Sequence, residues 1–553
     1  MDAGTQSIEE RARSNGSLLG GIRQSSGTIR TGSTNTRIMK KVLLFIGICF
    51  AFNGHVSGKT ENVNRYEITI GSSLRELYVE ANLERVGSYL TMDWEAAEFL
   101  PDGWSTYVEN LQANTPEGER INLKYEPPGR WFMENADTNR IQLKYKIRIN
   151  HDDIEWEEGG HDESAYVIDD LLFFIGRAVF ITAGQRPEVP DANTYRIGFQ
   201  NLPDNYGLTS IWTAEMPDSE DVSRVWTAYG THELIGSVVL IGDQITKTIQ
   251  GSGVEVILSS SAEYAAGLAA FGSVFEPLLS NATKVFGSLP DSKFVLVANI
   301  APVTKTQEPY FSGGVLHRSM SIISPFVPDE NVLPMIQYVL FHEYLHLYGL
   351  AMNLDPTEMY HNYWFLEGVH DYMSTRLLHG GGLMTDDELM TAANNGLSTN
   401  FNKYLAVAGK TNIRLAGEHK FDNYDLIYSG GYIIGVAMDI AFLEASDGQY
   451  DLLKYLKDVL ELGLAKKEGN YVTFKELYSL AVEKGGDAQK QLFEEYILGN
   501  EVVPLADYLK KVGLKSSLDG EGNKIIEMDN NVDFKTASRR DIFFHRRVFQ
   551  TSR

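Results

Sequence analysis

Two histidines and a glutamate form the part of the sequence best equipped for chemistry. The apolar segment 339–349 contains the pattern His-Glu-x-x-His, made by His342, Glu343 and His346. On a helix, positions i and i+4 lie on the same face, so the two imidazoles can bind one metal ion. Glu343 would flank that ion and accept a proton from metal-bound water. The alternative is a buried apolar helix whose two histidines serve only packing.

A zinc hydrolase also needs a third protein ligand and an open fourth position. Glu367 follows His346 after twenty residues, enough for the chain to turn and return as a second helix. It lies among aromatic and apolar residues, where a carboxylate is costly to bury unless it is paired or bound to metal. We therefore predict Glu367 as the third ligand, and Asp371, one turn later, as the group that orients a ligating imidazole. The alternatives for the third ligand are His361, His370 and Asp371.

The sequence patterns around the two metal-binding segments predict a small sheet followed by helices. Residues 262–286 are expected to form a helix, and 293–300 and 313–323 two strands. The helix that carries the histidines should have Pro334 in its first turn and Gly349 as its C-cap. A mostly helical remainder completes an α+β catalytic domain at 260–514.

The segment before this domain has the pattern of antiparallel strands. Apolar and polar residues alternate at 66–70, 77–83 and 141–149, as in half-buried strands. Residues 60–259 are therefore predicted to form an all-β, sandwich-like amino-terminal domain. The acidic run at 151–163 lacks the ligand spacing of a calcium loop, which favours a solvated loop.

Composition limits the partners of the chain. The 553 residues leave room for several domains, and the formal net charge of −25 argues against nucleic acid or an anionic membrane as a partner. Cys49 is the only cysteine, so no disulfide framework is possible and the metal ligands must be histidine and carboxylate. Nothing in the sequence indicates the oligomeric state.

The two ends differ in character from the rest. Residues 1–38 are rich in Ser, Gly, Thr and Arg and are predicted to be disordered. Residues 39–58 have the lysines and short apolar run of a signal peptide, which implies a start at Met39 and an exported, periplasmic or secreted protein. A signal anchor is the alternative. The polar, then basic and aromatic, tail at 515–553 is expected to pack loosely or to dock on a partner.

These motifs resemble the glycyl aminopeptidase family of gluzincin zinc metallopeptidases (family sixty-one of the metallopeptidases). The resemblance runs from about residue 66 to about 514 and includes segments 285–290, 342–346, 364–368 and 428–431. It implies a thermolysin-like, mostly helical catalytic domain, one zinc ion per chain and a peptide or protein substrate. Tyr428 falls where the wider clan has the tyrosine that stabilises the oxyanion. Tyr432 is the alternative for that role.

Two departures from the family bear on specificity. The tail is too short for the PDZ domain that the family often has. The family strand Gly-Gly-Leu-Glu-His-Arg appears at 313–318 with Leu316 in place of the glutamate that pairs with a substrate's amino group. Exopeptidase and endopeptidase action both stay open. The strand is still predicted to line the substrate cleft and to bind an extended peptide, through Gly313, Gly314, Val315 and Leu316.

Together these observations predict a zinc-dependent, aminopeptidase-like peptidase that hydrolyses peptide bonds by a metal-activated water. Zinc is favoured over iron or manganese because the ligand set is His, His and Glu. Glu343 would move the proton and Tyr428 would stabilise the oxyanion. The alternatives are an inactive peptide-binding protein of the cell envelope and a gluzincin hydrolase of a non-peptide substrate. No lipid partner is expected beyond the possible signal anchor.

Overall fold

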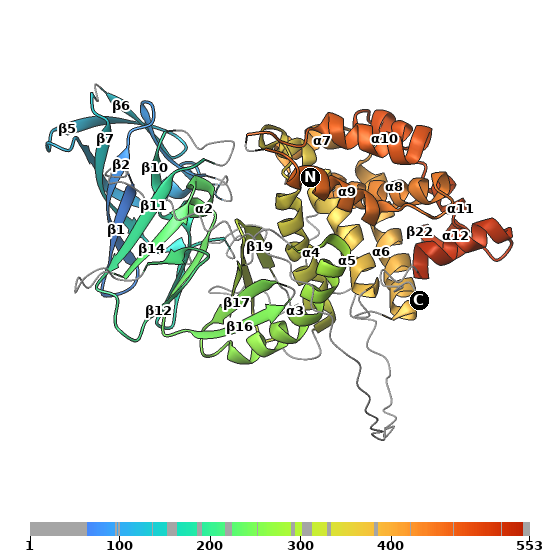
Figure 1. The fold of residues 1–553 in the computed structure, drawn as a ribbon, viewed down its shortest axis with the longest axis horizontal. Coiled ribbons are helices and arrows are strands. Elements are labelled where there is room, and N and C mark those ends of the chain that lie inside the picture. Colours follow the sequence, from blue (N-terminus) through green and yellow to red (C-terminus); the bar gives the residue numbers. More distant parts are fainter. Residues whose placement is uncertain are drawn as a thin grey trace, which may run out of the picture.

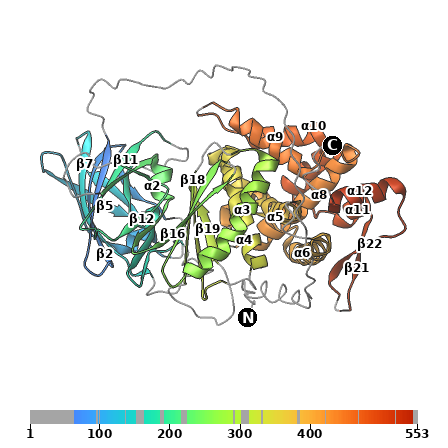
Figure 2. The ribbon, with the colours of Figure 1, turned by 60° about the horizontal axis from the view of Figure 1, so that its bottom comes forward.

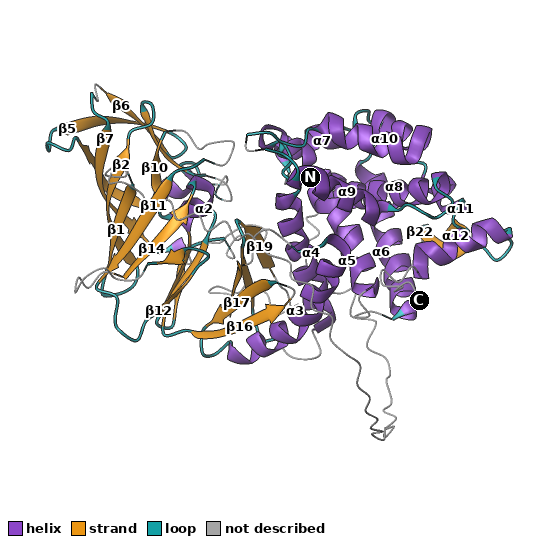
Figure 3. Cartoon of the chain, viewed as in Figure 1, coloured by secondary structure: helices purple, strands orange, loops and turns teal. Residues whose placement is uncertain are grey.

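The computed structural model describes residues 63–545 except 95–96, 98–99, 135–136, 152–162, 185–190, 216–223, 252, 289–292, 301–311, 329–332, 381–384, 421, 468 and 521. The predicted disordered segment, the predicted signal peptide and most of the acidic run lie outside the described residues. Strands gather at one end of the molecule and helices at the other (Figures 1 and 3). The predicted fold class, a β-rich region followed by an α+β, mostly helical region, is confirmed.

The first layer is a mostly antiparallel eleven-stranded sheet with the order β10-β3-β6-β5-β4-β7-β2-β1-β11-β14-β13. The alternating pattern of the sequence explains it, because one face of strands such as β2 and β7 is buried and the other is exposed. Its strands are β1 (Asn64–Ile70), β2 (Glu76–Glu84), β3 (Tyr89–Met92), β4 (Val108–Asn114), β5 (Arg120–Glu126), β6 (Arg130–Glu134), β7 (Arg140–Arg148), β10 (Ile181–Ala183), β11 (Thr194–Gln200), β13 (Thr213–Ala214) and β14 (Arg224–Tyr229).

The second layer is a four-stranded sheet that is buried on both faces. It runs in the order β12-β15-β9-β8. Every residue of β9 and β15 is buried, and alternate side chains enter two different hydrophobic clusters. Burial on both faces explains why these strands are continuous apolar runs. The strands are β8 (Tyr166–Ile168), β9 (Leu171–Ile175), β12 (Gly207–Thr209) and β15 (Val238–Gly242), with the short helix α2 (Thr231–Ile235) preceding β15.

The third layer is a five-stranded sheet with the order β16-β17-β18-β20-β19. It consists of β16 (Ile245–Gly251), β17 (Val254–Ser260), β18 (Lys293–Ile300), β19 (Ser312–Leu316) and β20 (Ser319–Ser324). The predicted domain boundary at residue 260 is therefore placed too late, since β16 and β17 pair with this sheet. The strand predicted at 313–323 is also wrong, because it is a hairpin that turns at Arg318 with a φ of 49°.

Helices cover the other face of this sheet. α3 (Ala265–Phe286) packs on β16 and β17, and α4 (Leu333–Ala351) packs on α3 and beside β19. The helical elements after α4 and up to α11 are η7 (Pro356–Glu358), η8 (Tyr360–Asn362), η9 (Trp364–Val369), α5 (His370–Gly380), α6 (Asp386–Val407), α7 (Ile413–Ala416), η10 (Gly417–His419), η11 (Leu426–Gly430), α8 (Gly431–Ala445), α9 (Leu452–Leu464), α10 (Phe474–Gln491), η12 (Leu492–Ile497) and α11 (Leu505–Lys510).

Helix α8 is the centre of the helical region, with η9, α5, α6, α9, α10, α11 and η12 packed around it. Together with η11 it gives one stretch, Leu426–Ala445, that is long and apolar enough to cross a membrane. Nearly all of that stretch is buried inside the molecule, which is typical of the core helix of a globular domain.

The described part of the carboxy-terminal tail, up to residue 545, does not pack loosely, contrary to the expectation from its composition. After α11 the chain forms the hairpin β21 (Leu514–Leu518) and β22 (Lys524–Met528) and the helix α12 (Phe534–His545). α12 packs on α6 and α8, at the end of the molecule away from the β-rich region (Figures 1 and 2). Phe543 and Phe544 are buried there, so the aromatic part of the tail belongs to the hydrophobic core.

Candidate metal centre

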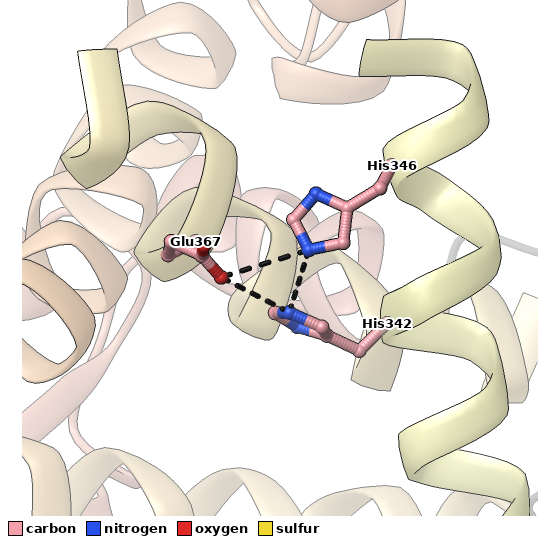
Figure 4. Close-up of side chains that lie close together, drawn as sticks. All are labelled: His342, His346 and Glu367. Atoms are coloured by element: carbon pink, nitrogen blue, oxygen red, sulfur yellow. Dashed lines mark hydrogen bonds and ion pairs between the residues drawn. The ribbon is translucent and has the colours of Figure 1, made fainter. Parts of the chain in front are cut away.

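Two neighbouring elements supply the predicted metal ligands. α4 carries His342 and His346 one turn apart, while its apolar residues, including Leu340 and Tyr344, are buried in the core. Glu367 lies in η9, a π-helical turn that leads directly into α5. α5 packs against α4, which brings the carboxylate to the two imidazoles (Figure 4). Short π-helical insertions are frequent at functional sites.

The three side chains turn one atom each toward a common point. His342 Nε2 and His346 Nε2 are 3.1 Å apart, and Glu367 Oε2 lies 3.3 Å from the first and 3.6 Å from the second. Ligands bound tetrahedrally to zinc at about 2.0–2.1 Å lie about 3.3 Å from one another. The arrangement therefore fits a zinc ion. His342 and Glu367 are buried, and His346 is partly exposed.

The other nitrogen of His342 faces Asp371, the residue that we predict to orient an imidazole. His342 Nδ1 lies 3.0 Å from Asp371 Oδ1, and the Tyr338 hydroxyl donates to the same oxygen at 2.8 Å. Burial opposes a charged imidazole, but the Asp371 and Glu367 carboxylates outweigh it and raise the pKa of His342 well above its usual value. Tyr338 was not predicted, although its position four residues before His342 was visible in the sequence.

Lys420 is the second residue that sequence reasoning missed. Its Nζ donates to Glu367 Oε1 at 2.7 Å, so the two carboxylate oxygens of Glu367 face different groups. Burial alone would raise the pKa of Glu367, but the Lys420 ammonium and the imidazoles hold that pKa well below its usual value. Lys420 is 53 residues from Glu367, and no pattern in the sequence connects them.

The two predicted catalytic residues stand next to this cluster. Glu343 follows His342 on α4, and burial raises the pKa of its carboxyl. Tyr428 lies in η11 and is half-buried, with its ring stacked on Tyr424 at 4.2 Å between centroids. Burial and the Glu367 charge raise the pKa of Tyr428, so its hydroxyl keeps its proton at neutral pH and can donate a hydrogen bond.

The alternatives for the third metal ligand and for the oxyanion donor stand outside the cluster of His342, His346 and Glu367. His361 pairs with Glu418 at 2.9 Å, and Tyr432 packs its ring against Tyr372. The His370 ring is 5.1 Å from that of His346, but it stands outside the cluster of possible metal ligands. Gly349 is inside α4 and is not the C-cap that we predicted. A Cβ on it would come within 3.1 Å of the His370 ring, so the glycine permits close packing of the two helices.

The predicted substrate-binding residues all lie in β19, at the edge of the five-stranded sheet and beside α4. Gly313, Gly314, Val315 and Leu316 pair with β20, and within the described part of the chain no strand pairs with their other edge. Leu316 packs against the hydrophobic cluster between the four-stranded and five-stranded sheets. Its side chain therefore has a packing role on the face opposite the helices.

No known family model matches the chain, and no curated protein matches it. Solved structures do match. An aminopeptidase N family protein from Idiomarina loihiensis is 14% identical, with a TM-score of 0.64 over 84% of this chain and 81% of that one. An M1 zinc metallopeptidase from Deinococcus radiodurans is 14% identical, with a TM-score of 0.50 over 80% and 94%. The chain therefore shares the fold of these structures. The narrower resemblance to glycyl aminopeptidases stays a prediction.

Proposed function

We propose that the protein is a zinc-dependent peptidase in which His342, His346 and Glu367 hold one zinc ion per chain. The observation that carries this proposal is the convergence of three donor atoms from α4 and η9, at separations that suit tetrahedral zinc. The names of two structural neighbours, an aminopeptidase N family protein and an M1 zinc metallopeptidase, support it. The glycyl aminopeptidase family is the closest fit to the sequence motifs.

The zinc ion, Glu343 and Tyr428 have different roles in the proposed reaction. Bound zinc supplies a Lewis acid and lowers the pKa of a coordinated water to about 7. Glu343 accepts the proton from the attacking water and passes it to the leaving amine. Burial suits it to this role, because its raised pKa is closer to neutral pH than that of an exposed glutamate. Tyr428 donates a hydrogen bond to the oxyanion.

The substrate is proposed to be a peptide that binds as an added strand along β19. Among the described residues, β19 has a strand on one side only, and the backbone groups of its other edge could pair with a peptide. Leu316 cannot hold an ammonium, so any preference for a free amino terminus must come from another group. We also propose export to the periplasm or outside the cell, with the segment 39–58 as the signal.

Metal analysis combined with peptide digestion tests the function. The purified protein should contain about one zinc ion per chain, and a chelator should abolish the cleavage of a mixed peptide library read by mass spectrometry. Matched peptides with free and acetylated amino termini would then distinguish exopeptidase from endopeptidase action. Zinc without hydrolysis of any peptide would overturn the peptidase proposal, leaving a peptide-binding protein or a hydrolase of another substrate.

A Glu343→Gln variant separates metal binding from catalysis. Removing the proton acceptor should lower the rate of hydrolysis by about 10²- to 10⁴-fold while zinc stays near one per chain. Unchanged activity would refute the assigned mechanism. In contrast, Glu367→Ala should lose the metal. Full zinc occupancy in that variant would return the third-ligand role to His361, His370 or Asp371.

A further inference from the structure

Lys420 occupies a defined environment beside the proposed metal site. It lies between η10 and η11, and its side chain is 23% exposed. Its ammonium donates to Glu367 Oε1 at 2.7 Å and lies 4.7 Å from the centre of the Tyr363 ring and 5.4 Å from that of Tyr428. One carboxylate and two aromatic faces thus hold a single cation, an arrangement in which each contact is attractive.

This contact makes the two oxygens of Glu367 unequal. Oε2 faces the two imidazoles, and Oε1 accepts from Lys420. A carboxylate can chelate a cation through both oxygens or bind it through one. Because Oε1 already accepts from an ammonium, binding of a metal ion through Oε2 alone is favoured over chelation through both oxygens.

The charges of Lys420 and Asp371 have opposite effects on the affinity of the site for a metal ion. The Asp371 carboxylate lies 3.0 Å from His342 Nδ1 and so strengthens that imidazole as a metal ligand. Lys420 draws electron density away from Glu367 and places a positive charge close to the site of a dication, which opposes binding. The same ammonium compensates the buried Glu367 carboxylate when no metal is present.

We propose that Lys420 is a positioning residue that makes Glu367 a one-oxygen ligand and holds zinc less tightly than the three ligands alone would. The proposal rests on the zinc site of the proposed function. Lys420 thereby keeps the bound metal electron-poor and lowers the affinity of the site for zinc. Lys420 also ties the Glu367 element to the ring of Tyr428, the proposed oxyanion donor.

The test compares a Lys420→Met variant with the wild-type full-length chain. Methionine keeps the length of the side chain and removes the charge. Competition with a chelator should show zinc bound on the order of tenfold more tightly, because the repulsion and the competing ion pair are gone. In the cobalt-substituted protein, the visible absorption should weaken as Glu367 gains its second oxygen as a ligand and the coordination number rises. Asp371→Asn should change the zinc affinity in the opposite direction.

Two further variants control for general damage. Lys466→Met removes a similar ion pair, with Glu476 at 2.6 Å and a lysine side chain 18% exposed, from outside the metal cluster. It should leave zinc affinity and the cobalt spectrum unchanged. Lys420→Arg retains the charge and should keep affinity near the wild-type value. If Lys420→Met does not fold, Lys420→Gln, which keeps a donor without the charge, takes its place.

The outcomes distinguish this inference from the proposed function. Tighter zinc binding with an altered cobalt spectrum supports the inference. Zinc affinity that is unchanged or weaker in the uncharged variant overturns it, since a residue with only a structural role would give that result. If the wild-type chain itself binds no zinc, the proposed function fails. If the wild-type chain binds zinc and the uncharged variant matches Lys466→Met, only the inference fails.

Discussion

Two polar residues, Asp371 and Tyr338, set the orientation of His342. Its Nε2 points to the metal position while its Nδ1 meets Asp371, which in turn accepts from Tyr338. Because Nδ1 faces Asp371, Nε2 is the ring nitrogen that is free to bind the metal. Tyr338 holds the carboxylate in place, so the ring orientation depends on a residue that never touches the metal.

Removing the charge of Asp371 should weaken the metal site without unfolding the protein. Asp371→Asn keeps the shape of the side chain but makes it a weaker acceptor for the His342 N–H. We expect zinc affinity to fall by about 10- to 100-fold, as for other residues that support a metal ligand. Tyr338→Phe should cause a smaller loss of the same sign. Chelator competition measures both, and equal affinities in all three proteins would contradict the proposed role of Asp371.

A buried histidine in the β-rich region gives the fold a dependence on pH. His151 is fully buried, with its ring near those of Trp104 and Tyr107, and its Nδ1 accepts from the Ala165 N–H. Burial, aided by the Arg148 charge, lowers the pKa of His151 to about 3. The unfolded chain takes up this proton near pH 6.5, well before the folded chain does.

The stability from neutral His151 should therefore be present above about pH 6.5 and decline as the pH falls towards 3. Between pH 7 and pH 4.5 the loss from this residue should be roughly 3 kcal/mol. A His151→Phe variant has no group to titrate, so its free energy of unfolding should fall less over the same range. Denaturant unfolding at both pH values measures the difference. Parallel losses in the two proteins would show that His151 does not titrate on unfolding.

The sequence was informative about residues where the chemistry is local. His342, Glu343 and His346 lie within one helix, and Glu367 is recognisable as an acid in an apolar segment, so their grouping could be predicted. Lys420 could not, because its relation to Glu367 depends on how η10 and η11 return to η9. The packing role of Leu316 was hidden for the same reason, since the hydrophobic cluster that it joins combines residues of two sheets.

At the scale of elements, η9 crosses the junction of η11 and α8 at two glycines beside the metal site. A Cβ on Gly368 would come within 2.5 Å of the Gly431 Cα and 2.6 Å of the carbonyl oxygens of Ile427 and Tyr428. Gly431 has an equally close approach to the backbone of η9. The crossing lets the element that carries Glu367 lie directly on the element that carries Tyr428.

Filling this crossing should separate the two elements. Gly368→Ala places a methyl group against backbone atoms that cannot move independently, and we expect a loss of about 1–3 kcal/mol of stability together with weaker zinc binding. Gly396→Ala is the control, because its Cβ would meet only the Tyr432 hydroxyl at an ordinary 3.5 Å. That control should be neutral or gain about 0.4–1 kcal/mol. Thermal unfolding with and without zinc compares them, and equal stability of the two variants would refute the tight crossing.

Element types were predictable from periodicity, but their exact ends and special turns were not. The helix at 265–286 and the strand at 293–300 follow directly from apolar patterns. The β19–β20 hairpin was read as one strand because its turn contains Arg318, a residue without turn preference. α4 continues past Gly349 because helix-to-helix packing uses that glycine.

At the scale of the molecule, the four-stranded sheet joins the two regions into one structure. One of its faces packs on the eleven-stranded sheet and the other on Val295, Val297 and Ile323 of the five-stranded sheet. Polar contacts reinforce this interface. Lys293 donates to the backbone oxygen of Ser210 at 2.9 Å, and Arg318 pairs with the buried Glu233 of α2 at 2.5 Å. The order of the regions was predictable, whereas the shared layer was not, because apolar runs do not reveal their partners.

A shared layer predicts that the two regions unfold together. Calorimetry of the wild-type chain should show a single heat-absorption peak, because neither region can expose its side of the interface at little cost. Val297→Asp, which buries an unpaired charge between the sheets, should move the whole peak to lower temperature. Val86→Asp, at a site 51% exposed in the β-rich region, should change stability by no more than about 0.5 kcal/mol. Two separate peaks, of which Val297→Asp moved only one, would show that the regions are thermodynamically independent despite their packed interface.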